Sequence, residues 1–326
     1  MSTSTFKAVI LAGGSGERFW PLSTPERPKQ FLRVFGGASL IRQAVSRLDG
    51  LVSPKDVFIV TAKNLVAATQ KELPELPKGN ILGEPMRRDT GAAVALGVGL
   101  AASEADPVIG FFSSDQMVAN PKAFRKVVSK AVAIARRKQV IVTLGIKPTY
   151  PATCFGYISP KTRTFVEKPD AKMAKKYVKA GYLWNAGMFI ARASTFRGAF
   201  AAHAPELSCL TSCTNHLSAL YSKLPKISFD YAVMEKSKNV EVVPGDFGWD
   251  DVGSFAAFDK YFPHDSRGNV REGPCTVVEA DGNICVARSA RISLLGVKNL
   301  VVVTTPDSVL VADKSRLTDM KKLFAR

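Results

Sequence analysis

A glycine-rich segment near the N-terminus carries the residues best suited to chemistry. It follows a short apolar run, residues 6–12, and it consists of Leu11, Ala12, Gly13, Gly14, Ser15, Gly16, Glu17 and Arg18. Glycines allow successive backbone N–H groups to turn toward one anion without obstruction by side chains. The segment is therefore predicted to bind phosphate, the alternative being a tight turn between a strand and a helix.

Two common phosphate-binding patterns fail in this segment. The dinucleotide pattern G-x-G-x-x-G begins at Gly14 and Gly16 but meets Phe19 where a third glycine is required. The P-loop pattern requires Lys and Ser or Thr after its last glycine, and the chain has Glu and Arg there. Arg18 and, beyond three prolines, Lys29 follow instead. A planar guanidinium and a compact ammonium suit an enzyme that stabilises charge on a transferring phosphoryl group and on a pyrophosphate leaving group.

The elements that must position these residues alternate between strands and helices. The apolar pattern predicts strands at residues 6–12, 57–61, 81–82, 108–112 and 140–144, and helices at 40–48, 90–103 and 121–137. Asn64 is predicted to cap a further helix after the second strand. This alternation predicts a Rossmann-like α/β fold with a mostly parallel sheet.

The pattern changes twice further along the chain. Beyond Pro148, single strands at residues 156–158, 164–166 and 188–190 indicate a second lobe on the same sheet. After Pro263, short apolar pieces at 275–279, 284–287, 300–304 and 309–311 are separated by Gly, Asn and Asp. They predict a small, β-helix-like appendage, followed by a helix from Lys314. The expected domains are residues 1–263 and 264–326.

Composition bounds the class of protein. The chain has 326 residues, of which 46% are hydrophobic and 22% charged, as in soluble globular proteins. The longest apolar run, residues 90–102, is too short to span a bilayer, and no signal peptide or membrane partner is expected. Five scattered cysteines favour free thiols in the cytoplasm, although Cys209, Cys213 and His216 could form a thin zinc site.

The formal charge of +17 is the unusual bulk property. The basic residues are spread along the whole chain, with no zinc-finger spacing and no basic run interleaved with aromatics. A basic surface that favours small phosphorylated substrates is therefore expected, and no nucleic-acid partner.

A series of short motifs follows along nearly the whole chain. The motifs are LAGGSGERFWPLS at residues 11–23, RPKQF at 27–31, EP with RDT at 84–90, SSD at 113–115, EKP at 167–169, WNAGMF at 184–189, DYAVMEK at 230–236 and FGWDDVG at 247–253. Any one motif is weak evidence, but their order and spacing are specific. Together they resemble the sugar nucleotidyltransferase family, and within it the mannose-1-phosphate guanylyltransferases, or GDP-mannose pyrophosphorylases.

The resemblance implies a Mg²⁺ site. Asp115 follows a strand that ends at Phe112, and ligands of open α/β sheets bind beyond such strand ends. Magnesium prefers one or two carboxylates together with phosphate oxygens. Helix capping is the alternative role for Asp115. Asp250 and Asp251 are candidates for the second carboxylate, and the resemblance favours Asp251.

The resemblance also implies a sugar site and a base site. Lys168 is expected to contact the sugar phosphate, Glu167 the sugar hydroxyls and Asn185 the hexose. A surface ion pair is the alternative for Glu167 and Lys168. The remaining sugar-site candidates are Gly145, Gly156, Tyr157, Gly187 and Asp230, with Glu235 as a supporting residue.

Guanine presents two neighbouring donors, which a carboxylate can accept side by side. Glu84 is therefore predicted to read guanine, with Arg88 and Thr90 nearby, unless its role is structural. The chain departs from the family at five positions, which affect details of base and sugar selection: Glu17, Asp89, Gly91, Gln116 and Cys154.

The implied reaction converts GTP and α-D-mannose 1-phosphate into GDP-mannose and pyrophosphate, with Mg²⁺ as cofactor. The catalytic candidates are Arg18, Lys29 and Lys168. The alternatives are the same chemistry on another nucleotide and hexose 1-phosphate, or a catalytically silent regulatory homologue. The appendage is a candidate contact of a homodimer. Because the sequence stops at Arg326, without the isomerase domain of longer relatives, isomerase activity is not expected.

Overall fold

The computed structural model describes residues 5–14, 16–102, 106–212 and 217–324. The chain divides into two compact units, which are described separately. The first consists of Met1–Gly13, Arg42–Ser114 and Val118–Trp249, and the second of Gly14–Ile41, Asp115–Met117 and Asp250–Arg326. Because both units are discontinuous in sequence, the predicted domain division at residue 263 stays a prediction.

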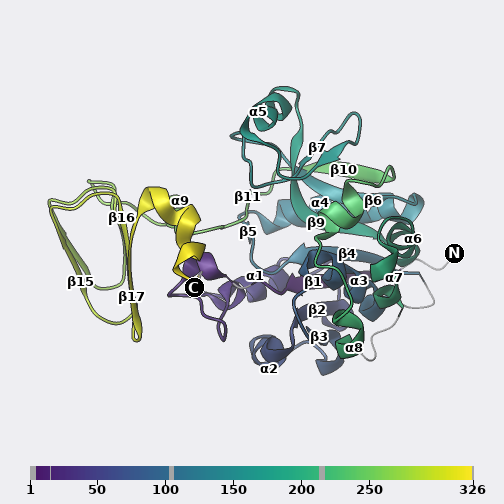
Figure 1. Ribbon diagram of the computed structural model, residues 1–326, viewed down its shortest axis with the longest axis horizontal. Coiled ribbons are helices and arrows are strands. Elements are labelled where there is room, and N and C mark those ends of the chain that lie inside the picture. The colour runs from purple at the N-terminus through teal and green to yellow at the C-terminus, as the bar shows by residue number, and fades with distance from the viewer. Residues whose placement is uncertain (1–4, 15, 103–105, 213–216, 325–326) are drawn as a thin grey trace. The chain divides into compact units, whose positions relative to one another are not determined.

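The first unit is built on a mostly parallel sheet, as the alternation of strands and helices predicts (Figure 1). The strand order is β10 (Val240–Gly245), β6 (Ile141–Ile146), β9 (Leu183–Arg192), β4 (Val108–Ser113), β1 (Phe6–Ala12), β2 (Val57–Ala62) and β3 (Ile81–Glu84). Strand β9 runs antiparallel to β4 and β6, and also pairs with β7 (Tyr157–Ile158), which pairs with β8 (Phe165–Val166).

The register of the sheet aligns the carboxyl ends of its central strands. Ala12 of β1 is opposite Thr61 of β2, and Ala62 of β2 is opposite Glu84 of β3. The Thr61 hydroxyl donates to the Ala12 carbonyl at 2.9 Å, which ties the two strand ends together. The residues that follow these strands therefore emerge at one edge of the sheet, where open α/β folds bind ligands.

Helices pack against this sheet. Helix α3 (Asp89–Ala101) is rich in small residues because it approaches its neighbours closely. A Cβ on Gly97 would lie 2.6 Å from the Phe111 ring, and one on Gly99 would clash with the Leu210 carbonyl oxygen. The other helices of this unit are α2 (Val66–Glu72), α4 (Pro121–Arg137), α5 (Ala171–Lys179), α6 (Ala193–His203), α7 (Pro205–Ser208) and α8 (Leu217–Tyr221). Helix α1 (Leu40–Ser46) begins in the second unit and ends in the first.

Several sequence expectations about elements need revision. Asn64 does not cap α2, because it lies in a 3₁₀ turn and the N-cap, Leu65, has no side-chain capping bond. The strand expected at residues 188–190 extends over the ten residues of β9. Strand β10 and helices α5 and α6 were not predicted, and the helix expected from Lys314 is a 3₁₀ helix, Lys314–Leu323.

The second unit contains stacked short strands, as the appendage prediction requires. Strands β12 (Val270–Glu272), β14 (Ile284–Ala287) and β16 (Leu300–Thr305) pair in parallel, and β17 (Ser308–Asp313) pairs antiparallel with β16. Strands β13 (Cys275–Val278) and β15 (Ile292–Leu295) form a second parallel pair. Val270, Ile284 and Val301 are opposite one another and fully buried, so successive coils share one core. The unit also contains α9 (Ala256–Tyr261) and parts of the paired two-residue strands β5 (Met117–Val118) and β11 (Trp249–Asp250).

A polar ladder runs through the stacked coils, a feature that the sequence analysis missed. The Asn283 side chain donates to Asn269 Oδ1 at 2.9 Å and to the Val297 carbonyl at 3.1 Å, and it accepts from the Leu300 amide at 2.9 Å. Asn269 and Asn283 are almost completely buried. Buried amides that satisfy the backbone at coil corners fix the stacking register, because an unpaired polar group there would be costly.

Candidate functional site

In the second unit, Lys29 lies at the centre of a charged cluster. Its ammonium donates to Asp115 Oδ2 at 2.9 Å and to the Asp251 carbonyl at 2.8 Å, and only 6% of the residue is exposed. Gly16 makes this position accessible to Lys29: its φ is 67°, and a Cβ there would lie 2.6 Å from the Lys29 backbone nitrogen. Glycine is therefore required at position 16, because any larger residue would collide with the backbone of Lys29.

Arg18 and the Asp251 carboxylate border the same cluster. A Cβ on Gly253 would lie 3.2 Å from an Arg18 guanidinium nitrogen and 3.2 Å from Asp251 Oδ2, so both groups converge on this glycine. Burial raises the pKa of Asp251, and the charge of Asp115 adds to this, while Lys29 and Arg18 act in the opposite direction. Two cations and two carboxylates therefore lie together, as the sequence analysis predicts for a phosphate and metal site.

The structure separates the roles of the two adjacent aspartates. Asp250 accepts from the Val252 amide at 2.7 Å and forms an ion pair with Lys260, so its carboxylate is occupied by its own loop. Asp251 is the one whose carboxylate interacts with Asp115, Lys29 and Arg18. Helix capping by Asp115 does not occur, since Asn120 caps α4 by accepting from the Ala123 amide at 3.0 Å.

The chemistry of these donors fits Mg²⁺. The negative charge of Asp115 disfavours the ionisation of Asp251, and a bound divalent cation would reverse this effect. Two carboxylates are also the protein share of a typical magnesium site that completes its coordination with phosphate oxygens and water. No group of three or more His, Cys, Asp or Glu residues suited to a metal occurs in the described ranges, so a site made of protein ligands alone is not present there.

The rest of the glycine-rich segment is divided between the units. Leu11 and Ala12 end β1 in the first unit, and Gly13 follows them. A Cβ on Gly13 would lie 3.5 Å from Glu84 Oε2, whereas one on Gly14 would meet nothing within 4 Å. Ser15, which was predicted to bind nucleotide, lies outside the described residues.

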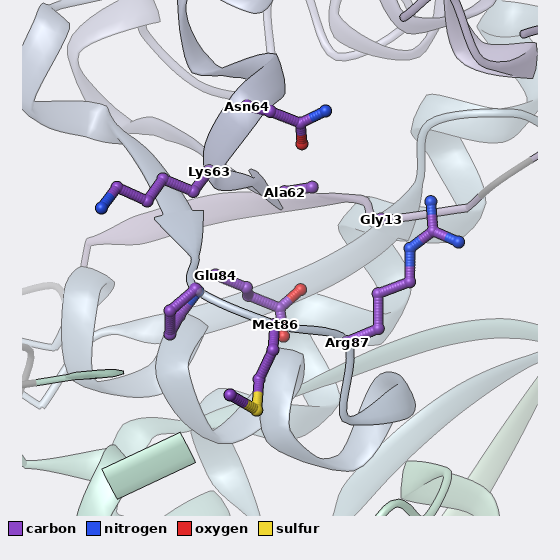
Figure 2. A pocket seen from close by; sticks show the side chains of 8 residues that line it. Gly13, Ala62, Lys63, Asn64, Glu84, Met86 and Arg87 are labelled. Atoms are coloured by element: carbon purple, nitrogen blue, oxygen red, sulfur yellow. The ribbon is translucent and has the colours of Figure 1, made fainter. Parts of the chain in front are cut away.

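A pocket of about 600 Å³ lies at the carboxyl ends of β1, β2 and β3 (Figure 2). Its lining includes Gly13, Lys63, Asn64, Glu84 and Arg87. The Glu84 carboxylate faces this pocket from the end of β3, and the residue is only 8% exposed. Burial raises its pKa to about 7, opposed by a hydrogen bond from the Tyr221 hydroxyl at 3.2 Å and assisted by the charge of Asp89.

Arg88 and Thr90, the two predicted neighbours of Glu84, make contacts with backbone. The Arg88 guanidinium donates to the carbonyls of Tyr221 and Ser222 at 2.7 and 2.9 Å. The Thr90 hydroxyl accepts from the Phe229 amide at 2.9 Å. Both residues therefore hold the segment at residues 221–229, which supplies Tyr221 to Glu84, so any effect of theirs on nucleotide acts through that support.

A second set of predicted residues gathers around Asn185 in β9. Its amide nitrogen donates to Asp230 Oδ1 at 2.9 Å, and its Oδ1 accepts from the Thr143 hydroxyl at 2.7 Å and from the Gly187 amide at 3.1 Å. Gly145 is opposite Asn185 in the sheet, and the Asn185 backbone amide donates to the Gly156 carbonyl at 2.8 Å. These contacts hold the Asn185 side chain in one orientation.

Glu167, Lys168 and Asp230 form the charged part of this region. The Lys168 ammonium lies 2.9 Å from Glu167 Oε1, so the ion pair considered from the sequence is present. Burial alone would lower the pKa of Lys168. The hydrogen bond to Glu167 and the negative charges of Glu167 and Asp230 outweigh burial and raise this pKa. Burial raises the pKa of Asp230, and the charge of Glu167 raises it further. A phosphate that approached Lys168 would compete with Glu167 for the ammonium.

Tyr157 and Gly156 contribute in different ways. Tyr157 is fully buried, its hydroxyl donates to the Ala152 carbonyl at 2.8 Å, and its strand pairs with β8 on one side and β9 on the other, so its role is to support the site. A Cβ on Gly156 would clash with Glu167 Oε2, so the glycine is required for Glu167 to take this position. Glu235, predicted as support, accepts from the Glu167 amide at 2.8 Å.

Four residues in or next to this pocket were not predicted from the sequence to bind nucleotide. Lys63, Asn64 and Arg87 line the pocket, and Tyr221 donates to Glu84. Lys63 and Asn64 directly follow β2, so the rule that ligands bind beyond strand ends could have identified them. Arg87 is adjacent in sequence to Arg88, which was predicted to bind nucleotide. Only the structure shows that Arg87 lines the pocket while Arg88 binds backbone carbonyls. Tyr221 is 137 residues from Glu84 in sequence, and no local pattern connects them.

The cysteines and the longest apolar segments were also considered from the sequence. Cys154, Cys209, Cys275 and Cys285 take part in no disulfide bond within the described residues. The zinc site considered from the sequence includes Cys213 and His216, which lie outside the described ranges. Over the described part of the chain, no helix has the length and apolar character needed to cross a membrane.

The first unit has a mostly parallel sheet with a pocket at the carboxyl ends of its strands, and the second unit carries a charged cluster suited to phosphate. These features define the class of nucleotide-binding α/β proteins. The family profile described as nucleotidyl transferase matches residues 7–267, and a profile described as a MannoseP isomerase/GMP-like β-helix domain matches residues 273–326. The chain is 35% identical to a mannose-1-phosphate guanylyltransferase of Escherichia coli K12, over 99% of this chain and 73% of that protein. It is also 35% identical to the mannose-1-phosphate guanylyltransferase RfbM of Salmonella typhimurium, over 98% of this chain and 72% of that protein.

A solved structure from Thermus thermophilus, named a mannose-1-phosphate geranyltransferase, is similar over 99% of each chain, with a TM-score of 0.90 and 34% identity. The chain belongs to the nucleotidyl transferase family, and the two relatives that it matches at 35% identity are named mannose-1-phosphate guanylyltransferases. The fold class and the family predicted from the sequence are thereby confirmed.

Proposed function

We propose that the protein transfers GMP from GTP to α-D-mannose 1-phosphate and releases pyrophosphate. The observation that supports this best is the similarity to mannose-1-phosphate guanylyltransferases over almost the whole chain. The charged cluster of Lys29, Arg18, Asp115 and Asp251 supplies the groups that such a transfer needs. Retention of these groups argues against a catalytically silent homologue.

In the proposed reaction an oxygen of the mannosyl phosphate attacks the α-phosphorus of GTP in line. A new P–O bond forms, the bond from the α-phosphorus to the oxygen bridging to the β-phosphorus breaks, and pyrophosphate leaves with that electron pair. A phosphate oxygen needs no deprotonation to attack at neutral pH, so no general base is required. Arg18 and Lys29 stabilise the charge that develops on the leaving group, and Lys168 orients the attacking phosphate.

Asp115 and Asp251 are the proposed ligands of Mg²⁺, which would supply charge neutralisation of the triphosphate when bound. Lys29 has a second task in this arrangement. Its contacts with Asp115 Oδ2 and with the Asp251 carbonyl fix the direction of both residues. The protein thereby positions the carboxylates before substrate arrives.

Glu84 is proposed to accept from N1–H and the N2 amino group of guanine. Asn185 is proposed to donate its second amide hydrogen to the hexose, since its Oδ1 already accepts two hydrogen bonds. Each side chain is held by an internal partner, Tyr221 for Glu84 and Asp230 for Asn185. Gly145, Gly156, Tyr157, Gly187 and Glu167 are proposed as the surrounding sugar-site residues.

The test is a panel of nucleotides and sugar phosphates with release of pyrophosphate as the readout. GTP with mannose 1-phosphate is expected to exceed UTP or dTTP with glucose 1-phosphate in kcat/KM by at least about 100-fold, the discrimination that a site built on buried polar contacts provides. Equal or greater rates with UTP and glucose 1-phosphate would contradict the proposed substrates but not the reaction type.

The assembly and setting are proposed as well. Leu295, Val309 and Val311 of the second unit are 72%, 63% and 63% exposed, and apolar side chains exposed in this way mark association surfaces. We propose that they contribute to a homodimer, for which light scattering of wild type and Leu295→Lys is the test; equal masses would contradict it. The proposed location is the cytoplasm, where free thiols stay reduced.

A further inference from the structure

Two adjacent arginines follow Glu84, and their side chains have different surroundings. Arg88 donates to the backbone carbonyls of Tyr221 and Ser222. Arg87 instead lines the pocket, and Figure 2 shows its guanidinium extending toward Gly13. Within the described residues Arg87 forms no hydrogen bond or ion pair, so its five donors are available to a ligand.

The pocket therefore presents an acceptor pair and a donor pair. The acceptor pair is the Glu84 carboxylate, and the donor pair belongs to the Arg87 guanidinium. A third charged residue, Lys63, extends its ammonium to the opposite side of the pocket in Figure 2. Gly13 leaves the space next to Glu84 open, since a Cβ there would lie 3.5 Å from Glu84 Oε2.

Guanine is complementary to both pairs at once. Its N1–H and N2 amino group are donors, and the adjacent O6 and N7 are acceptors that match the planar fork of arginine. Adenine presents an amino group in place of O6, where it would face the donors of Arg87. Pyrimidines have no N7. The carboxylate selects guanine because guanine has two adjacent donors, N1–H and the N2 amino group. The arginine adds a second requirement, two adjacent acceptors on the O6 and N7 edge of the base.

We propose that Arg87 determines nucleotide specificity by donating to O6 and N7 of guanine while Glu84 accepts from N1–H and the N2 amino group. This inference rests on the proposed function, since it assumes that guanine is the base bound in the pocket. It adds Arg87 to Glu84, the guanine reader predicted from the sequence, whereas Arg88 was predicted only as a nearby nucleotide-binding residue.

The two contacts can be tested separately with nucleotide analogues. 7-Deaza-GTP lacks N7 and reports on Arg87, whereas ITP lacks the N2 amino group and reports on Glu84. Wild-type protein is expected to prefer GTP over 7-deaza-GTP by about tenfold in kcat/KM, the lower part of the range for a bidentate arginine contact. Arg87→Ala is expected to reduce this preference to near one, to raise KM for GTP by about tenfold, and to leave the preference for GTP over ITP unchanged.

Two further variants complete the design. Arg87→Lys keeps the charge but lacks the planar fork, so it should retain at most part of the preference for N7. Arg137→Ala removes an exposed arginine at the end of α4, outside the pocket, and should behave as wild type. Calorimetric titration with the same nucleotides, without sugar phosphate, measures the ratios independently of catalysis.

The outcomes are distinguishable. A wild-type preference near one for GTP over 7-deaza-GTP, or an unchanged preference in Arg87→Ala, would overturn the role of Arg87. Binding of GTP with the expected ratios but without pyrophosphate release would overturn the proposed reaction and support the role of Arg87. If Arg87→Ala does not fold, the same ratios in Arg87→Lys decide the question.

Discussion

The raised pKa of Glu84 predicts that guanine recognition weakens below neutral pH. The side chain is buried at the end of β3, and its pKa is raised from 4.5 to about 7. Only the ionised carboxylate can accept from both guanine donors. With a pKa of about 7, the ionised fraction falls about tenfold between pH 8 and pH 6, and apparent affinity falls in proportion to the competent fraction.

Replacement of Glu84 by Gln removes this titration. The amide has one acceptor and one donor group, so one guanine donor loses its partner. Loss of a hydrogen bond to a charged group costs about 1.5–3 kcal/mol, or roughly 10- to 100-fold in affinity at pH 8. At pH 6 most wild-type molecules are already protonated, so wild type and Glu84→Gln should differ much less there.

Calorimetric titration with GTP at several pH values is the assay. The phosphates of GTP also titrate in this range, but they do so equally for both proteins, so the ratio of the two dissociation constants isolates Glu84. This ratio should rise about tenfold from pH 6 to pH 8. The selection for GTP over ITP should rise in parallel in wild type only. A ratio that stays constant with pH would refute the assignment of Glu84 as the guanine acceptor.

Protein stability gives an independent measure of the same group. Because the folded pKa of Glu84 lies above its unfolded value, the folded state holds the proton more tightly, and stability falls as pH rises from about 4.5 to about 7. The difference corresponds to about 3 kcal/mol. Glu84→Gln should lack this loss, so its free energy of unfolding relative to wild type should increase over the same pH range. A constant difference would mean that Glu84 is not buried as described.

Further predictions concern the charged cluster and the asparagine ladder. Lys29→Met should lower kcat/KM by about 10²- to 10³-fold, as measured by pyrophosphate release, because a buried cation that stabilises leaving-group charge is lost; a decrease below about threefold would exclude that role. Asp251→Asn should raise the Mg²⁺ concentration for half-maximal rate by at least about tenfold, whereas Asp250→Asn should change it less than about twofold; equal effects would reverse the assignment. Asn283→Ala removes three side-chain hydrogen bonds, including that to Asn269, and should lower the free energy of unfolding by about 2–4 kcal/mol in thermal or urea denaturation. A loss below about 0.5 kcal/mol would show that the ladder does not stabilise the coils.

Much of the fold could be predicted because its signals are local. Alternating apolar runs and amphipathic segments indicated the order of strands and helices in the first unit, and helix α4 has the predicted bounds, Pro121–Arg137. The antiparallel insertion of β9 between β6 and β4 could not be predicted, since pairing over such separations depends on the packing of the whole sheet. The ladder of Asn269 and Asn283 was missed because buried asparagines have no periodic signal of their own.

The candidate site was predictable to a different extent in each part. Arg18, Lys29, Asp115 and Asp251 were identified from residue types and family motifs, and they do lie together. Which of two neighbouring residues contributes its side chain to the site depends on the direction of each side chain. The local sequence does not determine that direction. Asp251 differs from Asp250 in this respect because the latter is bound to Val252 and Lys260.

Formation of GDP-mannose by this protein is the most direct test of its proposed function. Purified protein incubated with GTP, mannose 1-phosphate and Mg²⁺ is predicted to yield GDP-mannose and pyrophosphate in equal amounts, identified by chromatography and mass spectrometry. Lys29→Met and wild type with excess chelator should each yield far less. If wild-type protein binds GTP but no GDP-mannose is formed, the proposed transfer of GMP to mannose 1-phosphate is contradicted.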